Sequence, residues 1–354
     1  MKRFISLLVT FMMLFALLTG CSKDNDTSKP NTESEQKASS EEGNDFPELS
    51  ITIATTHPNN EEDSLYLYCK TLADIVTEKT DGKVTFDIIG DSVLGDDTEI
   101  AQGIAMGTLQ MGVTSSAAVS SYEACHQFLG LPFIFDDYED AHVFLDSDIS
   151  AEMNELLYDD GLKVLNVLDG GFRECLNTTR PITDVDSFDG LKWRVVPQDM
   201  WITMFNLLGA NSTPMSGAEV FTGLQQGTID GCEFPVSSIY SMQLYTATKY
   251  LDMTNHIFAA WYCCMSDELW ESFSPELQQI FVDAGKEANE VARQADQDSV
   301  EVQLSAIEEA GVQVNRNVDT TNMRAAVEPM YANYRDAIGA DIYDRAMAFI
   351  KSMH

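Results

Sequence analysis

Positive charge is scarce in this 354-residue chain, which has 21 Lys and Arg residues against 57 Asp and Glu residues. The formal net charge of −36 at pH 7 argues against nucleic acid as a partner, because surfaces that bind nucleic acid are basic. The five histidines are scattered and the seven cysteines lack zinc-site spacing, so no metal or other cofactor is predicted. The chain also lacks a phosphate-binding loop, an HExxH helix and a Ser-His-Asp order, which argues against a secreted hydrolase and predicts a protein that is not an enzyme.

The one long apolar run stands at the start of the chain. Lys2 and Arg3 precede residues 4–18, a run shorter than the roughly 20 residues of a membrane-spanning helix, and this layout is typical of an export signal. The sequence LTGC, which ends at Cys21, resembles the bacterial lipoprotein box. The resemblance implies that residues 1–20 are a signal peptide and that Cys21 carries a lipid anchored in the membrane. An uncleaved anchor and an ordinary signal peptide are the alternatives.

Apolar side chains are almost absent from residues 22–45, where one alanine is the exception. Nothing there offsets the entropy of ordering, so residues 21–46 are predicted to be the lipidated cysteine and a disordered tether. The sequence that follows is long enough for two domains of ordinary size and contains no further apolar run of spanning length.

Strand and helix patterns alternate along this remaining sequence, which predicts an α/β fold with a parallel sheet and helices on both faces. The double glycine Gly170-Gly171 divides the pattern into two blocks. A helical pattern from Pro275 to Ala310 would be about 50 Å long, so the helix should run along both domains. The expected strands are 49–54, 83–89, 109–113, 162–168, 172–177, 192–196 and 257–265, and the other expected helices are 62–80, 98–106, 138–159, 200–208 and 218–226.

Arginine is confined to one short region in most of the chain. Between residues 22 and 292 the only arginines are Arg173, Arg180 and Arg194. Two interpretations remain open. Each arginine pairs with a neighbouring acid such as Glu174, or the arginines converge on a cleft and bind a ligand carboxylate, whose geometry a planar guanidinium matches with two parallel hydrogen bonds.

Six cysteines remain once Cys21 is assigned to the lipid. Their even number permits disulfides after export, but a body of this size does not need them, so we interpret them as small buried side chains. These residues are Cys69, Cys125, Cys175, Cys232, Cys263 and Cys264.

Several segments occur in an order and at a spacing that resemble a known family. The segments are 98–113 (TEIAQGIAMGTLQMGV), 131–135 (LPFIF), 171–173 (GFR), 189–195 (DGLKWRV) and 224–231 (LQQGTIDG). They resemble the extracytoplasmic solute receptors of tripartite ATP-independent periplasmic (TRAP) transporters, the DctP-like group, over roughly residues 49–310.

The resemblance implies two α/β domains around a ligand cleft, each built from discontinuous segments and joined by crossing strands and the long helix. The first domain would comprise 47–170 and 257–290, and the second 171–256 and 291–354. Ligand binding would close the cleft, as in other hinged binding proteins. The implied function is the capture of a small carboxylate and its delivery to TRAP membrane permease subunits; the alternative is a ligand-sensing receptor for a membrane kinase.

Within the family, the arginine of the GLK-φ-R-V segment binds the ligand carboxylate, and this residue is Arg194 here. The arginine of the GFR segment, here Arg173, is a frequent second contact. Two positions depart from the family pattern: Phe234 replaces an asparagine that binds the ligand, and Gly217 replaces an aromatic residue. These changes suggest that an aromatic wall has moved across the pocket, which leaves a dicarboxylate, a sugar acid or an apolar carboxylate open as the ligand.

Three further cleft residues are expected because open α/β sheets bind ligands at the carboxyl ends of their strands. They are His57, Thr114 and Ser115, although His57 could equally be a turn residue at the surface. Glu219 and Glu233 are expected to orient arginines or cap helices, because a carboxylate ligand would be repelled by direct contact with them.

Overall fold

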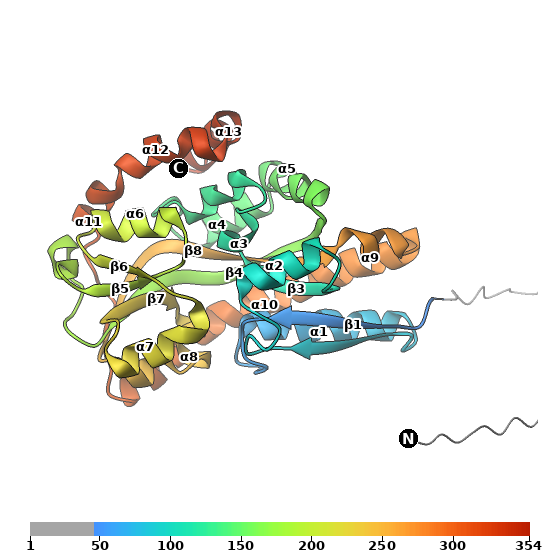
Figure 1. Ribbon diagram of the computed structural model, residues 1–354, viewed down its shortest axis with the longest axis horizontal. Helices are drawn as coiled ribbons and strands as arrows, with labels where there is room; N and C mark the ends of the chain where they lie inside the picture. Colours follow the sequence, from blue (N-terminus) through green and yellow to red (C-terminus); the bar gives the residue numbers. More distant parts are fainter. Residues whose placement is uncertain (1–45) are drawn as a thin grey trace, which may run out of the picture. The chain divides into compact units, whose positions relative to one another are not determined.

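The computed structural model describes residues 46–354 (Figure 1). The predicted signal peptide, tether and Cys21 lipid site lie outside the described residues. Within 46–354, no helix combines the length and the apolar character that crossing a bilayer requires.

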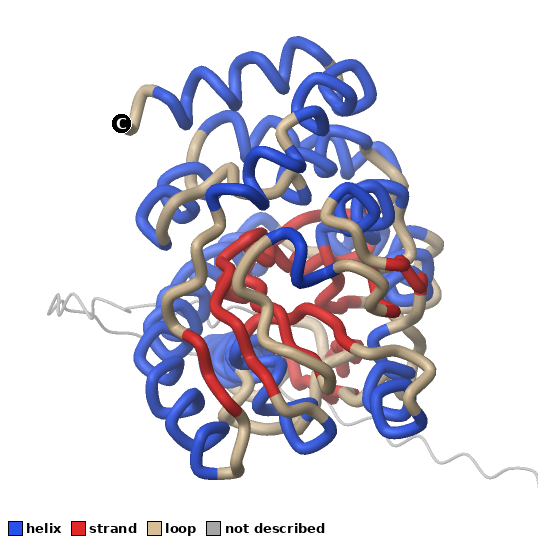
Figure 2. The backbone as a smooth tube through the Cα atoms, turned by 90° about the vertical axis from the view of Figure 1, so that its left-hand side faces the viewer, coloured by secondary structure: helices blue, strands red, loops and turns tan. Residues whose placement is uncertain are grey.

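Residues 46–354 form one sheet of nine strands in the order β2-β1-β3-β8-β4-β7-β5-β6, with β9 paired to β8. We call the part around β1, β2 and β3 the first lobe and the part around β5, β6 and β7 the second lobe. Helices lie on both sides of the strands, as predicted (Figure 2). The strands are β1 (Leu49–Thr55), β2 (Val84–Ile89), β3 (Met111–Ser115), β4 (Leu162–Asn177), β5 (Lys192–Val195), β6 (Asn211–Pro214), β7 (Gly231–Pro235), β8 (Tyr250–Ser266) and β9 (Gln313–Asn315).

The prediction of a parallel sheet is correct only within each lobe. The pairs β1/β2, β1/β3, β5/β6 and β5/β7 are parallel, whereas β3/β8, β4/β8 and β4/β7 are antiparallel. The reason is that β4 and β8 cross between the lobes in opposite directions. They therefore insert an antiparallel pair at the centre of the sheet.

The double glycine does not separate two blocks, because β4 continues through Gly170 and Gly171 as one strand. The register with β8 shifts between Asp169 and Phe172, and Gly171 adopts a φ of +78°. A Cβ at Gly171 would lie 3.0 Å from Oδ2 of Asp296. Glycine is thus required where the crossing strand bulges against the long helix.

The long helix is present as α10 (Pro275–Glu309), with Ser274 as N-cap and proline at its first position. It packs against α1 and β4 and continues to α8 and β9, so the prediction that it runs along both lobes is confirmed. The predicted helix 138–159 is broken, because Ser147 caps a new helix by accepting a hydrogen bond from the amide of Ser150. The other α-helices are α1 (Ser64–Lys79), α2 (Asp97–Ala105), α3 (Ser116–Val119), α4 (Tyr138–Leu145), α5 (Asp148–Leu156), α6 (Asp199–Leu207), α7 (Val220–Gln226), α8 (Val236–Ser241), α9 (Asp267–Ser272), α11 (Thr321–Val327), α12 (Pro329–Ile338) and α13 (Ala340–Lys351).

Apolar residues at helical spacing fix the first lobe against α10. On α1, Leu65, Cys69, Leu72 and Val76 are buried at intervals of three or four residues and join a core that includes Phe281 of α10. All six cysteines from Cys69 to Cys264 are buried and free, which confirms their interpretation as small core side chains.

Candidate functional site

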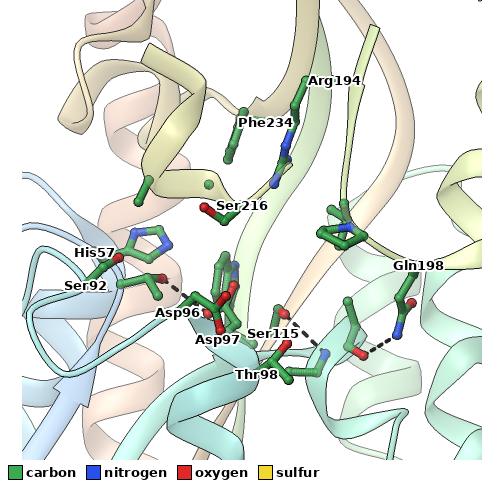
Figure 3. A pocket seen from close by; sticks show the side chains of 18 of the residues that line it. His57, Ser92, Asp96, Asp97, Thr98, Ser115, Arg194, Gln198, Ser216 and Phe234 are labelled. Atoms are coloured by element: carbon green, nitrogen blue, oxygen red, sulfur yellow. Dashed lines mark hydrogen bonds between the residues drawn. The ribbon is translucent and has the colours of Figure 1, made fainter. Parts of the chain in front are cut away.

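A cavity of about 120 Å³ opens between the lobes, at the carboxyl ends of β1, β3 and β5 (Figure 3). Loops and helix starts of both lobes line it, together with the crossing strands. The lining includes 56–57, 92, 96–98, 115, 117–118 and 121 from the first lobe, 194, 196–198, 216–218, 234 and 242 from the second lobe, and Arg173 and Trp261 from β4 and β8.

Arg194 reaches the cavity from β5 and is only 3% exposed. Its Nε donates to the backbone oxygen of Met215 at 2.9 Å, while Nη1 has no hydrogen-bond partner in the described part of the chain. No carboxylate of residues 46–354 forms an ion pair with it. Burial lowers the pKa of Arg194 to about 10, so the guanidinium is still charged at neutral pH. A buried cation that lacks a counter-ion is suited to receive an anionic ligand.

Arg173 also lines the cavity, but an acid of the protein already occupies its guanidinium. Nη2 donates to Oε1 of Glu233 at 2.9 Å, and Nε donates to the other carboxylate oxygen. Burial, the largest single effect, raises the pKa of Glu233, but the charges and hydrogen bonds of Arg173 and His256 together outweigh it and hold this pKa at about 2. The pairing interpretation therefore describes Arg173, although the partner is Glu233 rather than the neighbouring Glu174. Arg180 does not reach the cavity, because it donates to backbone oxygens of the loop before β5.

Phe234 forms an aromatic wall between the two arginines. Its ring centroid lies 5.0 Å from the guanidinium carbon of Arg194 and 5.3 Å from that of Arg173, within the range of cation–π attraction. Gly217 lies on the cavity wall, and a Cβ there would meet no atom within 4 Å. The two positions that depart from the family pattern are thus both beside the cavity.

His57 lies at the cavity and not at an exposed turn. Its Nδ1 is 2.8 Å from Oδ2 of Asp63, and its ring stands edge-on to Trp261 at 4.6 Å. Burial lowers the pKa of His57, but Asp63 and Asp97 together raise it more, so the net direction is upward. The charge that His57 carries when protonated is therefore balanced by Asp63.

Ser115 lines the cavity, whereas the adjacent Thr114 does not. Successive side chains of a strand point to opposite faces, and Thr114 is fully buried with its hydroxyl donating to the backbone oxygen of Asp97 at 2.7 Å. The expectation that Thr114 lies in the cleft is therefore wrong, and its observed role is to hold the start of α2. The side chain of Glu219 accepts a hydrogen bond from the backbone amide of Ser216 and so caps the short helical turn 217–219, as expected.

Sequence reasoning missed Asp97, the first residue of α2, which lines the cavity beside the helix cap Asp96. The hydroxyl of Thr56 donates to Oδ1 of Asp97 at 3.2 Å. Burial raises the pKa of Asp97 to about 6, so the carboxyl is ionised at pH 7. The sequence DDTE shows the pattern of a helix start, but nothing in it indicates that the second aspartate faces a ligand.

A two-lobed α/β molecule with a charged cavity at the lobe junction belongs to the class of hinged solute-binding proteins. The model of the family described as bacterial extracellular solute-binding protein, family 7 (DctP), matches residues 55–337, and the chain belongs to this family. The prediction of a TRAP-type extracytoplasmic solute receptor is confirmed.

Relatives of different ligand preference share this fold. The 2,3-diketo-L-gulonate-binding periplasmic protein YiaO of Escherichia coli K12 is 30% identical over 74% of this chain and 80% of its own length. A TRAP periplasmic solute-binding protein from Polaromonas sp. JS666 bound to D-erythronate has a TM-score of 0.82 and 28% identity, over 85% of this chain and 99% of that one. A homologue from Sulfurospirillum deleyianum with bound succinate has a TM-score of 0.80 and 25% identity, over 86% and 99%.

Proposed function

We propose that this protein captures a small organic carboxylate outside the cytoplasm, closes around it and delivers it unchanged to the membrane subunits of a TRAP transporter. The observation that carries the proposal is the guanidinium of Arg194, which is buried at the cavity and forms no ion pair with any described residue. The relatives bound to erythronate and succinate hold ligands that share a carboxylate. The proposed role is binding without chemistry.

In this proposal the ligand carboxylate meets the two terminal nitrogens of Arg194, because Nε is already engaged by Met215. Two parallel charge-assisted hydrogen bonds would fix both the position and the plane of the carboxylate. Arg173 would contribute long-range attraction rather than a full second pair of hydrogen bonds, since Glu233 holds its Nε and Nη2. Phe234 would pack against the carbon skeleton next to the bound carboxylate.

Closure would bring together two domains, 47–170 with 257–290 and 171–256 with 291–354. Two polar contacts join the lobes in this structure. The hydroxyl of Ser241 donates to Asp63 at 2.9 Å, and the amide of Gln198 donates to Ser120 at 2.6 Å. Such contacts would form as the lobes approach and would help to hold the ligand-bound state.

We further propose that Cys21 anchors the protein to the membrane through a lipid.

A thermal-shift screen over organic acids tests the proposed function. A ligand that binds only the native state raises the unfolding temperature in proportion to the logarithm of its concentration over its Kd. We expect one or more small carboxylates to raise it, and their neutral amides, which lack the anionic group, to leave it unchanged. If amides and acids act alike, or if no acid acts, the carboxylate site is refuted.

A further inference from the structure

The cavity at Arg194 continues into a second, larger pocket, and we propose that this outer pocket holds the tail of the ligand. The ligand that fits it is a monocarboxylate with an elongated, uncharged and mainly apolar tail. Gly217, which leaves the passage between the two pockets open, sets the length of ligand that the protein accepts. The inference rests on the proposed function, because it takes Arg194 as the site of the carboxylate.

The outer pocket has a volume of about 400 Å³ and is lined by both lobes. Five residues line both it and the cavity, so the two spaces share a wall. They meet on the side of the cavity where Ser92 lies, away from Gln198 (Figure 3). The shared residues are Thr56 and Ser92 of the first lobe and Gly217, Ala218 and Met242 of the second lobe.

The cavity alone is small for a ligand site. Its volume of about 120 Å³ is less than the roughly 150 Å³ of an engineered cavity that holds benzene. Ligand sites in proteins commonly measure about 300–1,000 Å³. A carboxylic acid much longer than butyrate therefore has to extend beyond the cavity, and the outer pocket is large enough for that extension.

Gly217 lies at the boundary of the two pockets, where a side chain would have open space. It is the first residue of the helical turn 217–219, and a Cβ there would meet no atom within 4 Å. It is not among the glycines with a positive φ, so any residue could adopt its backbone conformation. Neither backbone nor packing thus requires glycine at 217, and its effect there is an unobstructed passage.

The outer pocket coexists with contact between the lobes. Ser241, which lines it, donates to Oδ2 of Asp63 in the first lobe at 2.9 Å. The pocket is therefore present where the two lobes already touch, so it is not simply the space between separated lobes.

The backbone around the outer pocket has an unusual conformation. Six described non-glycine residues have a positive φ, and three of them line this pocket: Asp91, Ser92 and Gln243, each with a φ of +56°. L-residues rarely adopt this conformation, and residues that do so cluster at ligand sites. The amides of Asp91 and Ser92 donate to backbone oxygens of His57 and Thr55 at the end of β1, which fixes this part of the wall.

The lining of the outer pocket disfavours a second charge on the ligand. Among the described residues that form it, Asp91 is the one charged side chain, so it offers no cation to a second carboxylate. The hydroxyls of Thr56 and Ser241 already donate to carboxylates of the protein. An uncharged tail is therefore the one that this wall accepts at the lowest cost.

Apolar side chains form much of the remaining wall, namely Pro58, Ala218, Phe221, Met242 and Leu244. Phe221 and Met242 are only partly buried, although they pack on the core around α7 and α8. An apolar tail would cover their remaining surface, which is favourable in proportion to the apolar area removed from water. The tail that fits is thus mainly apolar.

Calorimetric titration of the wild-type protein with butyrate, hexanoate and octanoate tests the inference, and octanedioate tests the effect of a charged tail. Burial of one methylene group strengthens binding by about fourfold. We expect octanoate to bind at least about tenfold more tightly than butyrate, with hexanoate between them. Octanedioate should lose this gain, because no cation of the described lining meets its second carboxylate.

The variant Gly217→Phe places a large side chain in the passage. We expect it to bring octanoate to within about threefold of butyrate, because the tail no longer reaches the outer pocket. Gly217→Leu, with a smaller side chain, should give an intermediate ratio. The matched control is Gln225→Phe, which adds the same ring at an exposed position of α7 outside both linings and should keep the wild-type ratio.

Failure of this inference is distinguishable from failure of the proposed function. If octanoate binds the wild type no more tightly than butyrate, or if Gly217→Phe keeps the wild-type ratio, the outer-pocket proposal is wrong while the carboxylate site stands. Equal affinities for octanoate and octanedioate would overturn the uncharged tail. If none of these acids binds at millimolar concentration, or if octanoate binds Arg194→Ala as tightly as the wild type, both proposals are overturned.

Discussion

Replacing Arg194 should weaken ligand binding without destabilising the ligand-free protein. Nη1 has no hydrogen-bond partner among the described residues, and we expect it and Nη2 to bind the ligand. Charge-assisted hydrogen bonds contribute about 1.5–3 kcal/mol each. Loss of both in Arg194→Ala therefore removes ~3–6 kcal/mol of binding free energy, or about 10²- to 10⁴-fold in Kd. Arg194→Lys keeps the charge but not the planar pair of donors, so its affinity should lie between those of the wild type and the alanine variant.

The stability of the ligand-free protein should respond differently. A buried donor without a partner costs about 1–3 kcal/mol, and no ion pair is lost when Arg194 is removed. The unfolding temperature of Arg194→Ala without ligand should thus equal or exceed that of the wild type, while the shift produced by ligand disappears. Calorimetric titration gives the first quantity and scanning calorimetry the second.

The control for Arg194 is Arg180→Ala, because this guanidinium bonds backbone oxygens away from the cavity. It should leave the affinity unchanged. The reasoning about Arg194 is refuted if Arg194→Ala binds within about threefold of the wild type, less than 1.4 kcal/mol. It is also refuted if the ligand-free variant is destabilised as strongly as a broken buried ion pair.

Two other substitutions test the buried charges. Glu233→Ala should lower the free energy of unfolding by ~3–5 kcal/mol, because it leaves the charge of Arg173 buried and unpaired. Urea titration measures this loss, and a loss below about 1 kcal/mol would contradict the prediction. Burial and the neighbouring Asp169 raise the pKa of Asp296 to about 8, above the unfolded value of 3.8. Between these two pH values the folded state retains a proton that the unfolded state releases. Wild-type stability should therefore fall as the pH rises toward 8, and Asp296→Asn should reduce this fall; equal slopes in thermal unfolding against pH would reject the assignment.

The sequence predicted the elements of the fold better than their connections. Alternating patterns located most strands, and the proline and caps located α10, because these signals are local. Continuity of β4 through Gly170 and Gly171 was missed, since two glycines usually indicate a turn. Only the pairing with β8 and the packing on Asp296 show that they form a bulge within a strand. The antiparallel centre was missed for the same reason, because strand direction depends on contacts between distant segments.

The sequence predicted those site residues whose type is rare in this chain and has few possible roles. Arginines are rare in this acidic chain, so Arg173 and Arg194 were conspicuous, and both lie at the cavity. Their different states could not be predicted, because Glu233 is 60 residues from Arg173 and reaches it only through the pairing of β4 with β7. Asp97 was hidden for the opposite reason: among 57 acidic residues one more aspartate attracts no attention until its burial is known.

The contrast between the two arginines explains how a strongly acidic protein can bind an anion. Arg173 shows that an internal carboxylate can be brought to a guanidinium here. Within residues 46–354, by contrast, Arg194 hydrogen-bonds the carbonyl of Met215 and lies over the ring of Phe234, without an ion pair. An internal partner for Arg194 would stabilise the empty protein and would have to be displaced by every ligand, which weakens binding by the free energy of that pair. The unpaired cation lowers the stability of the ligand-free protein. When the ligand pairs with it, that free energy is recovered as binding free energy. The unpaired state of Arg194 is therefore the property on which affinity depends, and an acid introduced within reach of it should act as an internal competitor.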